Sequence, residues 1–325
     1  MKKFLLKLLL FSLPFVVLVL AMDSWLRNVD SLYKEKFQGI QRAKDTQILI
    51  LGNSHANYGV DPGSFSLPAY NLANPNQSLY FDKRLVQKLL PSLPKLKYVL
   101  ISIDYHSLYF SSQGIRDVWS YYANGIAYKN RNYYLENISP FLFGYTPGVS
   151  ISMLKKQLLK NIHNKDHKLI QFEVQEGVNL TDNIVNGYLG FEGVDEKSFN
   201  PGYYSERIAG FNQKIKNSTE RLEIIQDLTE FLSVLKSRNI IPVFFSTPVY
   251  VEFYKYADKH TLLQNKKDIN AICRKLQLQY FDYSDGSLFN KSDFYDCDHL
   301  NKQGARTFSR IVNEKLNIFQ NSHQN

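Results

Sequence analysis

The sequence predicts an α/β fold, with a parallel five-strand sheet between two layers of helices and a large insertion after the third strand. Short apolar runs alternate with segments whose apolar residues recur at helical spacing, a pattern typical of parallel strands joined by helices. The strand-like runs are apolar throughout, so we expect the sheet to be covered on both faces. With 325 residues, 44% hydrophobic and 21% charged, the chain can bury a core of this size. The expected arrangement is a flavodoxin-like three-layer α/β/α sandwich.

The N-terminus differs from the rest of the chain. Residues 1–22 begin with Lys2 and Lys3, followed by a nearly uninterrupted apolar stretch from Phe4 to Ala21. This pattern predicts a signal anchor or a signal peptide, and the basic residues ahead of it predict that the remaining chain lies outside the cytoplasm. Val19-Leu20-Ala21 fits a cleavage site, so secretion after cleavage stays open, although we favour an uncleaved single-pass anchor in the cell membrane.

The main domain is expected at residues 46–320, after a polar, amphipathic stalk at residues 23–45. The predicted strands are apolar runs bounded by glycine, proline or polar residues, at 47–52, 69–73, 98–103, 240–246 and 279–282. The predicted helices carry apolar residues at helical spacing, at 81–90, 217–238, 260–276 and 303–316. Asn217-Ser218-Thr219-Glu220 resembles an N-cap with glutamate at N3.

Residues 107–216 interrupt the alternation and are rich in Tyr, Phe, Asn and Gly. A loop of this length inside a compact domain is usually functional or has structure of its own, so we interpret it as an inserted cap subdomain. Aromatic residues such as Tyr121, Tyr122 and Tyr203 suit stacking on sugar rings, but core packing explains them as well.

The charge and cysteine patterns restrict the class of partner. The net charge is +9, but the basic residues are scattered and form no dense run of the kind that binds nucleic acid. Cys273 and Cys297 would form one disulfide in an oxidising compartment, or Cys273 is a buried free thiol. Their spacing from histidines does not predict a zinc site.

Two short motifs near opposite ends of the chain carry the candidate chemistry. Gly52-Asn53-Ser54-His55 follows the first predicted strand, and Asp296 precedes His299 by three residues, just before the last predicted helix. Serine becomes a nucleophile when a base accepts its proton, and an acid fixes the tautomer of that base. A lone serine after a strand is more often a helix cap, and a lone histidine is often structural. The combination, in this order along an α/β chain, favours a catalytic triad.

These two motifs resemble the nucleophile block and the acid–base block of the SGNH hydrolase (GDSL-like) superfamily. The resemblance implies that Ser54 is the nucleophile, His299 the base and Asp296 the residue that orients it, with no metal or organic cofactor. With its predicted anchor, the chain is similar to the extracytoplasmic glycan O-acetyltransferase and D-alanyl-lipoteichoic acid type proteins of the superfamily. Those proteins often work beside a membrane-bound O-acyltransferase, which the resemblance implies as a partner here.

The sequence departs from the superfamily pattern at the oxyanion hole. Residues 71–78 contain no glycine, and the third strand ends in Ser102-Ile103-Asp104-Tyr105 without the usual asparagine. We expect the amide of Ser54 to contribute a donor, with a second from Asn74, Asn76 or Gln77, although each of these side chains also suits a turn. Asp104 and His106 form a rival Asp/His pair, for metal binding or for the base.

The expected function is therefore a serine esterase or O-acyltransferase outside the cytoplasm, with acetyl as the expected acyl group and a cell-envelope or secreted glycan as substrate. The alternative is a non-catalytic glycan-binding or assembly protein with a degenerate triad that partners a membrane-bound O-acyltransferase. The intact serine, histidine and aspartate favour the enzyme, and the incomplete oxyanion blocks favour the alternative.

Overall fold

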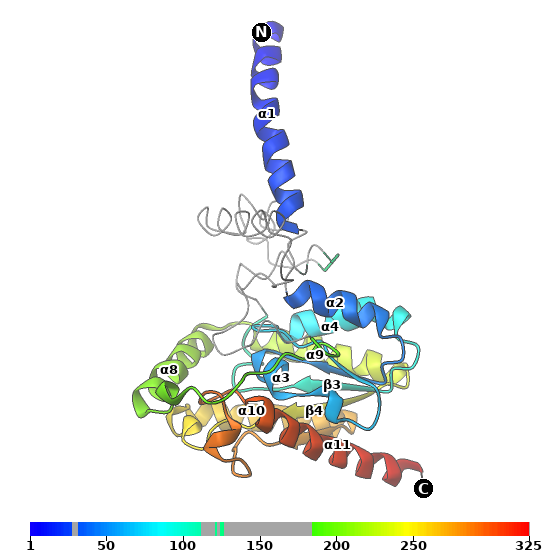
Figure 1. Cartoon of the computed structure of the whole chain (residues 1–325), viewed down its shortest axis with the longest axis vertical. Helices are drawn as coiled ribbons and strands as arrows, with labels where there is room; N and C mark the ends of the chain where they lie inside the picture. Colours follow the sequence, from blue (N-terminus) through cyan, green and yellow to red (C-terminus); the bar gives the residue numbers. More distant parts are fainter. Residues whose placement is uncertain (28–31, 112–120, 122–123, 127–183, 325) are drawn as a thin grey trace. The chain divides into compact units, whose positions relative to one another are not determined.

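The computed structural model describes residues 1–27, 32–111, 121, 124–126 and 184–324 (Figure 1). The chain divides into two compact units. Glu35–Ser112 together with Val174–Asn325 forms the unit that contains the sheet, and Met1–Lys34 together with Gln113–Glu173 forms the other. Most of the predicted cap at residues 107–216 lies outside the described residues.

The sheet has five strands, all parallel, in the order β2-β1-β3-β4-β5. Their bounds are β1 Ile48–Leu51, β2 Ala69–Asn71, β3 Tyr98–Ser102, β4 Ile241–Ser246 and β5 Gln279–Asp282. This strand order is that of a flavodoxin-like sheet, in which ligands bind beyond the carboxyl ends of the strands. The predicted fold class is confirmed, because each predicted apolar run contains its strand.

Helices cover both faces of this sheet (Figure 1). On one side, α3 (Ser54–Gly59) packs against α11 (Lys302–Gln324). On the other, α9 (Arg221–Ser237) packs against β4 and contacts both α4 (Leu79–Leu89) and α10 (Lys259–Leu276). All four residues of β1, Ile-Leu-Ile-Leu, are fully buried as a result. Each such side chain contributes about 1.5–3 kcal/mol by leaving water, which fixes the strand that leads into Ser54.

Three local expectations differ from the structure. A separate helix, α8 (Pro201–Asn217), precedes α9 and packs against the short η6 (Phe253–Tyr256), in the unit that contains the sheet. The expected capping box at 217–220 does not form, because α8 runs through Asn217 and the carboxylate of Glu220 accepts bonds from Ser111. The last helix, α11, continues well past the predicted end at residue 316.

The N-terminal helix α1 spans Lys2–Arg27. Its segment Lys2–Trp25 is 24 residues long and contains an 18-residue window with a mean hydropathy of 2.6, none of which is buried within the structure. A helix of this length and composition is consistent with a single-pass membrane anchor, and a signal sequence has the same character. Within the predicted stalk at 23–45, α2 (Leu32–Arg42) follows as a separate helix.

Candidate functional site

Ser54 is the first residue of α3, immediately beyond the carboxyl end of β1. The turn depends on Gly52, whose φ of +137° is unfavourable for other residues and whose missing Cβ would lie 2.5 Å from Cβ of Ser102. Asn53 caps the helix, because its side-chain oxygen accepts the amide of His55 at 2.9 Å. The chain therefore turns sharply at the sheet edge and presents the hydroxyl of Ser54 there.

His299 and Asp296 lie in the loop that precedes α11. The carboxylate of Asp296 accepts the backbone amides of Asp298 at 3.0 Å and His299 at 2.8 Å, which closes the loop into a rigid turn. The same carboxylate lies 2.9 Å from Nδ1 of His299. Because an ionised carboxylate only accepts, Nδ1 carries the proton of the neutral ring, and Nε2 is left as an acceptor.

The structure brings the three predicted triad residues into one hydrogen-bonded chain. Nε2 of His299 lies 2.9 Å from Oγ of Ser54, and the opposite nitrogen faces Asp296. The ring of His299 is buried, and the rings of Tyr58 and Phe191 each lie 5.7 Å from it, centroid to centroid. This apolar cover restricts the rotation of the imidazole and excludes water from its faces. The arrangement is suited to removing the proton from Ser54 Oγ.

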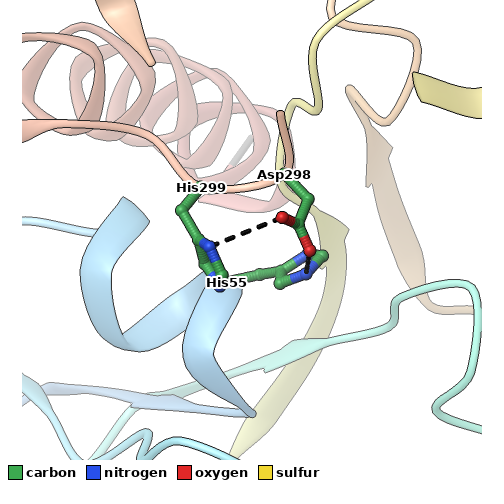
Figure 2. A group of neighbouring side chains, drawn as sticks. All are labelled: His55, Asp298 and His299. Atoms are coloured by element: carbon green, nitrogen blue, oxygen red, sulfur yellow. Dashed lines mark ion pairs between the residues drawn. The ribbon is translucent and has the colours of Figure 1, made fainter. Parts of the chain in front are cut away.

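A second set of charged groups adjoins His299, and Figure 2 shows His55 and Asp298 beside it. Nδ1 of His55 lies 3.2 Å from the carboxylate of Asp104, and its Nε2 lies 3.4 Å from the carboxylate of Asp298. Arg207 of α8 donates from Nε to Asp298 at 2.7 Å. Asp298 also lies 3.5 Å from Nδ1 of His299. One buried carboxylate thus contacts the loop before α11, helix α3 and helix α8.

The ionisation of this set follows from its geometry. Burial alone lowers the pKa of His55, but the carboxylates of Asp104 and Asp298 outweigh it and raise the pKa to about 10. Burial raises the pKa of Asp298, but the neighbouring cations, Arg207 foremost, outweigh it and hold the pKa well below its usual range. The same balance lowers the pKa of Asp104, with His55 as the main cation.

Part of this cluster has the residue types of a metal site. Ligand atoms of His55, Asp298 and His299 all lie within 4.8 Å of one another. A metal needs an unprotonated ring nitrogen with a free lone pair. Both nitrogens of His55 face carboxylates, and Nδ1 of His299 faces two oxygens of Asp296 at 2.9 and 3.0 Å. The remaining nitrogen, Nε2 of His299, lies 2.9 Å from Oγ of Ser54 and accepts its hydrogen bond. The donors are used in hydrogen bonds and ion pairs, so these residues do not fit a metal site.

The residues expected at the oxyanion hole have different environments. Asn74 is buried beside the nucleophile turn, where its backbone amide donates to the carbonyl of Gly52 at 3.1 Å. Asn76 is exposed, in a left-handed turn with φ of 60°. The amide of Gln77 donates to the carbonyl of Leu72 and to Asp82, so its two hydrogens are engaged inside the domain. Of the three, Asn74 is the one that a hydrogen bond holds against the nucleophile turn.

The rival Asp/His pair does not act together. Asp104 bonds His55 and accepts from Ser102 at 3.0 Å, whereas the ring of His106 stacks on Phe211 at 4.7 Å with an interplanar angle of 3°. Nε2 of His106 lies 3.2 Å from Nδ2 of Asn53 and so accepts from it. Burial is the main cause that lowers the pKa of His106, to about 4, so this ring is neutral. Cys273 and Cys297 are both free thiols.

A cavity of about 380 Å³ lies along the exposed side of α8. Its lining includes aromatic, cationic and acidic side chains of that helix: Tyr203, Glu206, Arg207, Phe211 and Lys214. Two of these connect it to the triad region. Arg207 bonds Asp298, next to His299, and Phe211 stacks on His106, which bonds the cap of the nucleophile helix.

Sequence reasoning missed the roles of His55, Asp298 and Arg207. His55 and Asp298 lie inside the two motifs quoted above. Each motif contains more ionisable residues than a triad needs, because His55 follows Ser54 directly and the second motif reads Asp-Cys-Asp-His. Their pairing depends on the fold, since α3 must lie on the loop before α11. Nothing near Arg207 in the sequence indicates a partner at position 298.

Comparison of the chain with known proteins shows its family. A family model described as "DltD protein" matches residues 150–314, slightly more than half of the 325 residues. Among solved structures, a catalytic mutant of an acetylxylan esterase from Geobacillus stearothermophilus is similar, with 13% identity, a TM-score of 0.34, and coverage of 83% of this chain and 93% of that chain. No curated protein sequence matches the chain. On the extent of the family match, the chain belongs to the DltD family, within the SGNH hydrolase superfamily.

Proposed function

We propose that the protein is an extracytoplasmic serine esterase or O-acyltransferase that acts on a cell-envelope or secreted glycan, with acetyl as the expected acyl group. The observation that carries the proposal is the hydrogen-bonded chain from Ser54 through His299 to Asp296. Membership of the DltD family supports a hydrolase or acyltransferase of the SGNH type acting outside the cytoplasm.

The reaction follows from the protonation of that chain. Oγ of Ser54 attacks the acyl carbonyl while its proton moves to Nε2 of His299, and Asp296 stabilises the resulting imidazolium. The tetrahedral intermediate collapses when the leaving alcohol takes that proton, which leaves an acyl ester on Ser54. A sugar hydroxyl or water then gives its proton to His299 and attacks the ester, which returns the free serine. The backbone amide of Ser54, with Asn74, is our proposed source of oxyanion donors.

The cavity along α8 is the proposed place for the acyl acceptor. Tyr203 and Phe211 offer aromatic surfaces of the kind that pack against sugar rings, and Lys214 offers a cationic hydrogen-bond donor. Arg207 links the cavity wall to the loop that carries His299. A glycan held there would approach the acyl-enzyme more readily than water, which favours transfer over hydrolysis.

The proposed setting is the outer face of the cytoplasmic membrane, with α1 as an uncleaved anchor. Protease added to intact spheroplasts should then remove the domain, and protection of the domain would contradict this topology. A membrane-bound O-acyltransferase is the proposed partner that supplies the acyl group. It should co-purify from detergent extracts if the two proteins form a stable complex.

A fluorophosphonate probe gives the direct test, because it reacts only with an activated serine. We expect it to label the full-length protein in detergent, and Ser54→Ala and His299→Ala each to abolish both labelling and aryl acetate turnover. The double variant should be hardly worse than either single one, because triad members act as a unit. The acyl content of the surface glycan, measured in cells with each variant, reports the physiological reaction.

The non-catalytic alternative predicts no labelling by the probe and no effect of Ser54→Ala on glycan acylation. The departures at the oxyanion hole favour it, together with the engagement of Gln77 in bonds within the domain. If the wild-type protein is not labelled, or if Ser54→Ala keeps both aryl acetate turnover and glycan acylation, the acyl-enzyme proposal is wrong and a glycan-binding or assembly role replaces it.

A further inference from the structure

His55 follows the nucleophile directly, yet the acyl-transfer chemistry does not use its side chain. Its ring is 5% exposed and its backbone amide is held by Asn53. Its two nitrogens face carboxylates from two other segments, Asp104 after β3 and Asp298 before α11. A neutral imidazole has one donor and satisfies only one carboxylate, whereas an imidazolium satisfies both. The geometry therefore selects the charged form.

The titratable and charged groups around His55 come from four segments. Asp104 and His106 follow β3, Asp298 and His299 precede α11, Arg207 lies on α8, and Tyr254 lies on η6. Of these, His106 accepts from Asn53 and is neutral, and Arg207 bonds Asp298. The two carboxylates and the two cations His55 and Arg207 balance each other within a buried region, where an unpaired charge is costly.

Asp298 places a second negative charge close to His299, and the neighbouring cations offset this charge. Its carboxylate lies 3.5 Å from Nδ1 of His299, only slightly farther than Asp296 at 2.9 Å. An uncompensated second anion there would compete with Asp296 for the ring proton. It would also favour a protonated ring before substrate binds, which removes the base. The contacts of Asp298 with His55 and Arg207 direct its negative charge toward these cations instead.

We infer that His55 is a positioning residue that carries a permanent positive charge and neutralises Asp298, which leaves Asp296 alone to act on the base. This role rests on the proposed serine chemistry, since it serves the base of that reaction. His55 also connects the helix that begins with Ser54 to the end of β3 and to the loop before α11. It therefore helps to fix the position of Ser54 relative to His299. His55 exchanges no proton with the substrate.

The charge of His55 is measurable without any activity. In full-length protein with ¹⁵N-labelled histidine, in detergent micelles, the ring nitrogens of His55 should show imidazolium shifts from pH 6 to pH 8.5. His106 is the internal comparison, because its ring should be neutral at pH 7 although its centroid lies 6.2 Å from that of His55. A neutral His55 at pH 7 overturns the inference.

The role of that charge is tested by the rate of fluorophosphonate labelling across pH. His55→Gln should move the acidic limb of the profile to higher pH by about one unit, the size expected for one charge removed at this range. Adding Asp298→Asn should move the limb back toward wild type, because the anion that needed compensation is gone. A residue with only a packing role would show no such recovery. His260→Gln, on the exposed start of α10, is the matched control and should leave the profile unchanged.

The outcomes separate this inference from the proposed function. A His55→Gln profile equal to that of wild type, or a shift that Asp298→Asn does not relieve in a folded double variant, overturns the positioning role while the acyl-enzyme stands. If wild type is not labelled at any pH, the acyl-enzyme proposal fails and the positioning role fails with it. The ring-nitrogen shifts still decide the charge of His55 in that case, and also if His55→Gln does not fold.

Discussion

Oγ of Ser54 lies 2.9 Å from Nε2 of His299, although the two residues are 245 positions apart in the chain. Parallel strands explain this proximity, because β1 and β5 both end at the same edge of the sheet. The packing of α3 against α11 then brings the segments that follow these strands together. The sheet topology thus brings the two residues close together. The turns at Gly52 and Asp296 then fix the positions of the Ser54 hydroxyl and the His299 ring.

Asp296→Asn should reduce aryl acetate turnover by on the order of a thousandfold or more. Asparagine presents an amide donor to Nδ1 of His299, so the ring takes the other tautomer and Nε2 can no longer accept from Ser54. The backbone bonds of the loop should survive, since the side-chain oxygen of asparagine can still accept the amides of 298 and 299.

Asp293→Asn is a suitable control, because this carboxylate lies in the same loop but bonds Asn290 and Gln303 and not His299. It should retain most of the turnover. If Asp296→Asn also keeps wild-type turnover in a folded protein, Asp296 does not orient the base, and Asp298 becomes the acid to examine.

Gly52→Ala should destabilise the protein and lower labelling by the fluorophosphonate probe. An added Cβ would lie 2.5 Å from Cβ of Ser102 in β3, and φ at this position is unfavourable for alanine. The nucleophile turn must shift to relieve this overlap, and Ser54 shifts with it. Gly210→Ala in α8 is the comparison: an added Cβ there would meet no atom within 4 Å outside the helix backbone, so the change should raise stability by about 0.5–1 kcal/mol. The thermal midpoints of both variants give the test. A Gly52→Ala midpoint equal to that of wild type would contradict the steric constraint at this turn.

The sheet was predictable because its strands are strongly apolar and bounded by clear breaks. The predicted 279–282 strand agrees with β5 at both ends, and the other four runs exceed their strands by one or two residues. Helix ends were less predictable. Asn217, the expected N-cap, is the last residue of α8, and the carboxylate of Glu220, expected at N3, is engaged by Ser111. Competition from distant partners of this kind is invisible in local spacing.

The candidate triad could be proposed from motif spacing, since Asp296 and His299 share one turn and Ser54 follows a strand. The supporting charges could not. The contact between Arg207 and Asp298 requires α8 to lie beside the catalytic loop, yet residues 107–216 had no predicted secondary structure. The environment of Gln77 also depended on the fold, because its amide donates to the carboxylate of Asp82 in the first turn of α4, which follows it in the chain.

Asp82→Asn should stabilise the protein at pH 8 and have much less effect at pH 4.5. Asp82 is buried, and burial is the main cause that raises its pKa from 3.8 to about 7, against the opposing bond from Gln77. The folded state therefore binds the proton more tightly than the unfolded state. Its stabilising contribution is full below pH 4 and is lost as pH rises through 7. Asparagine stays neutral throughout, so the gain at pH 8 should reach up to about 4 kcal/mol.

Urea unfolding of both proteins at several pH values gives this comparison, with the difference between them as the quantity of interest. Asp45→Asn is the control, since that carboxylate is exposed and pairs with Lys95 at the surface. It should show no gain with rising pH. A difference between Asp82→Asn and wild type that does not change from pH 4.5 to pH 8 would mean that Asp82 is ionised in the fold.

Lys214→Ala should weaken glycan acylation and leave aryl acetate turnover nearly unchanged. Lys214 lines the cavity along α8, away from the bonds that hold Ser54 and His299, so its loss removes a donor for the acceptor and no catalytic group. A charged hydrogen bond of this kind contributes roughly 1–1.5 kcal/mol, so KM for a glycan acceptor should rise about five- to tenfold. Lys216→Ala, an exposed lysine two residues away that does not line the cavity, is the matched control. Equal effects of the two variants on acceptor KM would indicate general electrostatic attraction of the glycan, and no effect of Lys214→Ala would place the acceptor elsewhere.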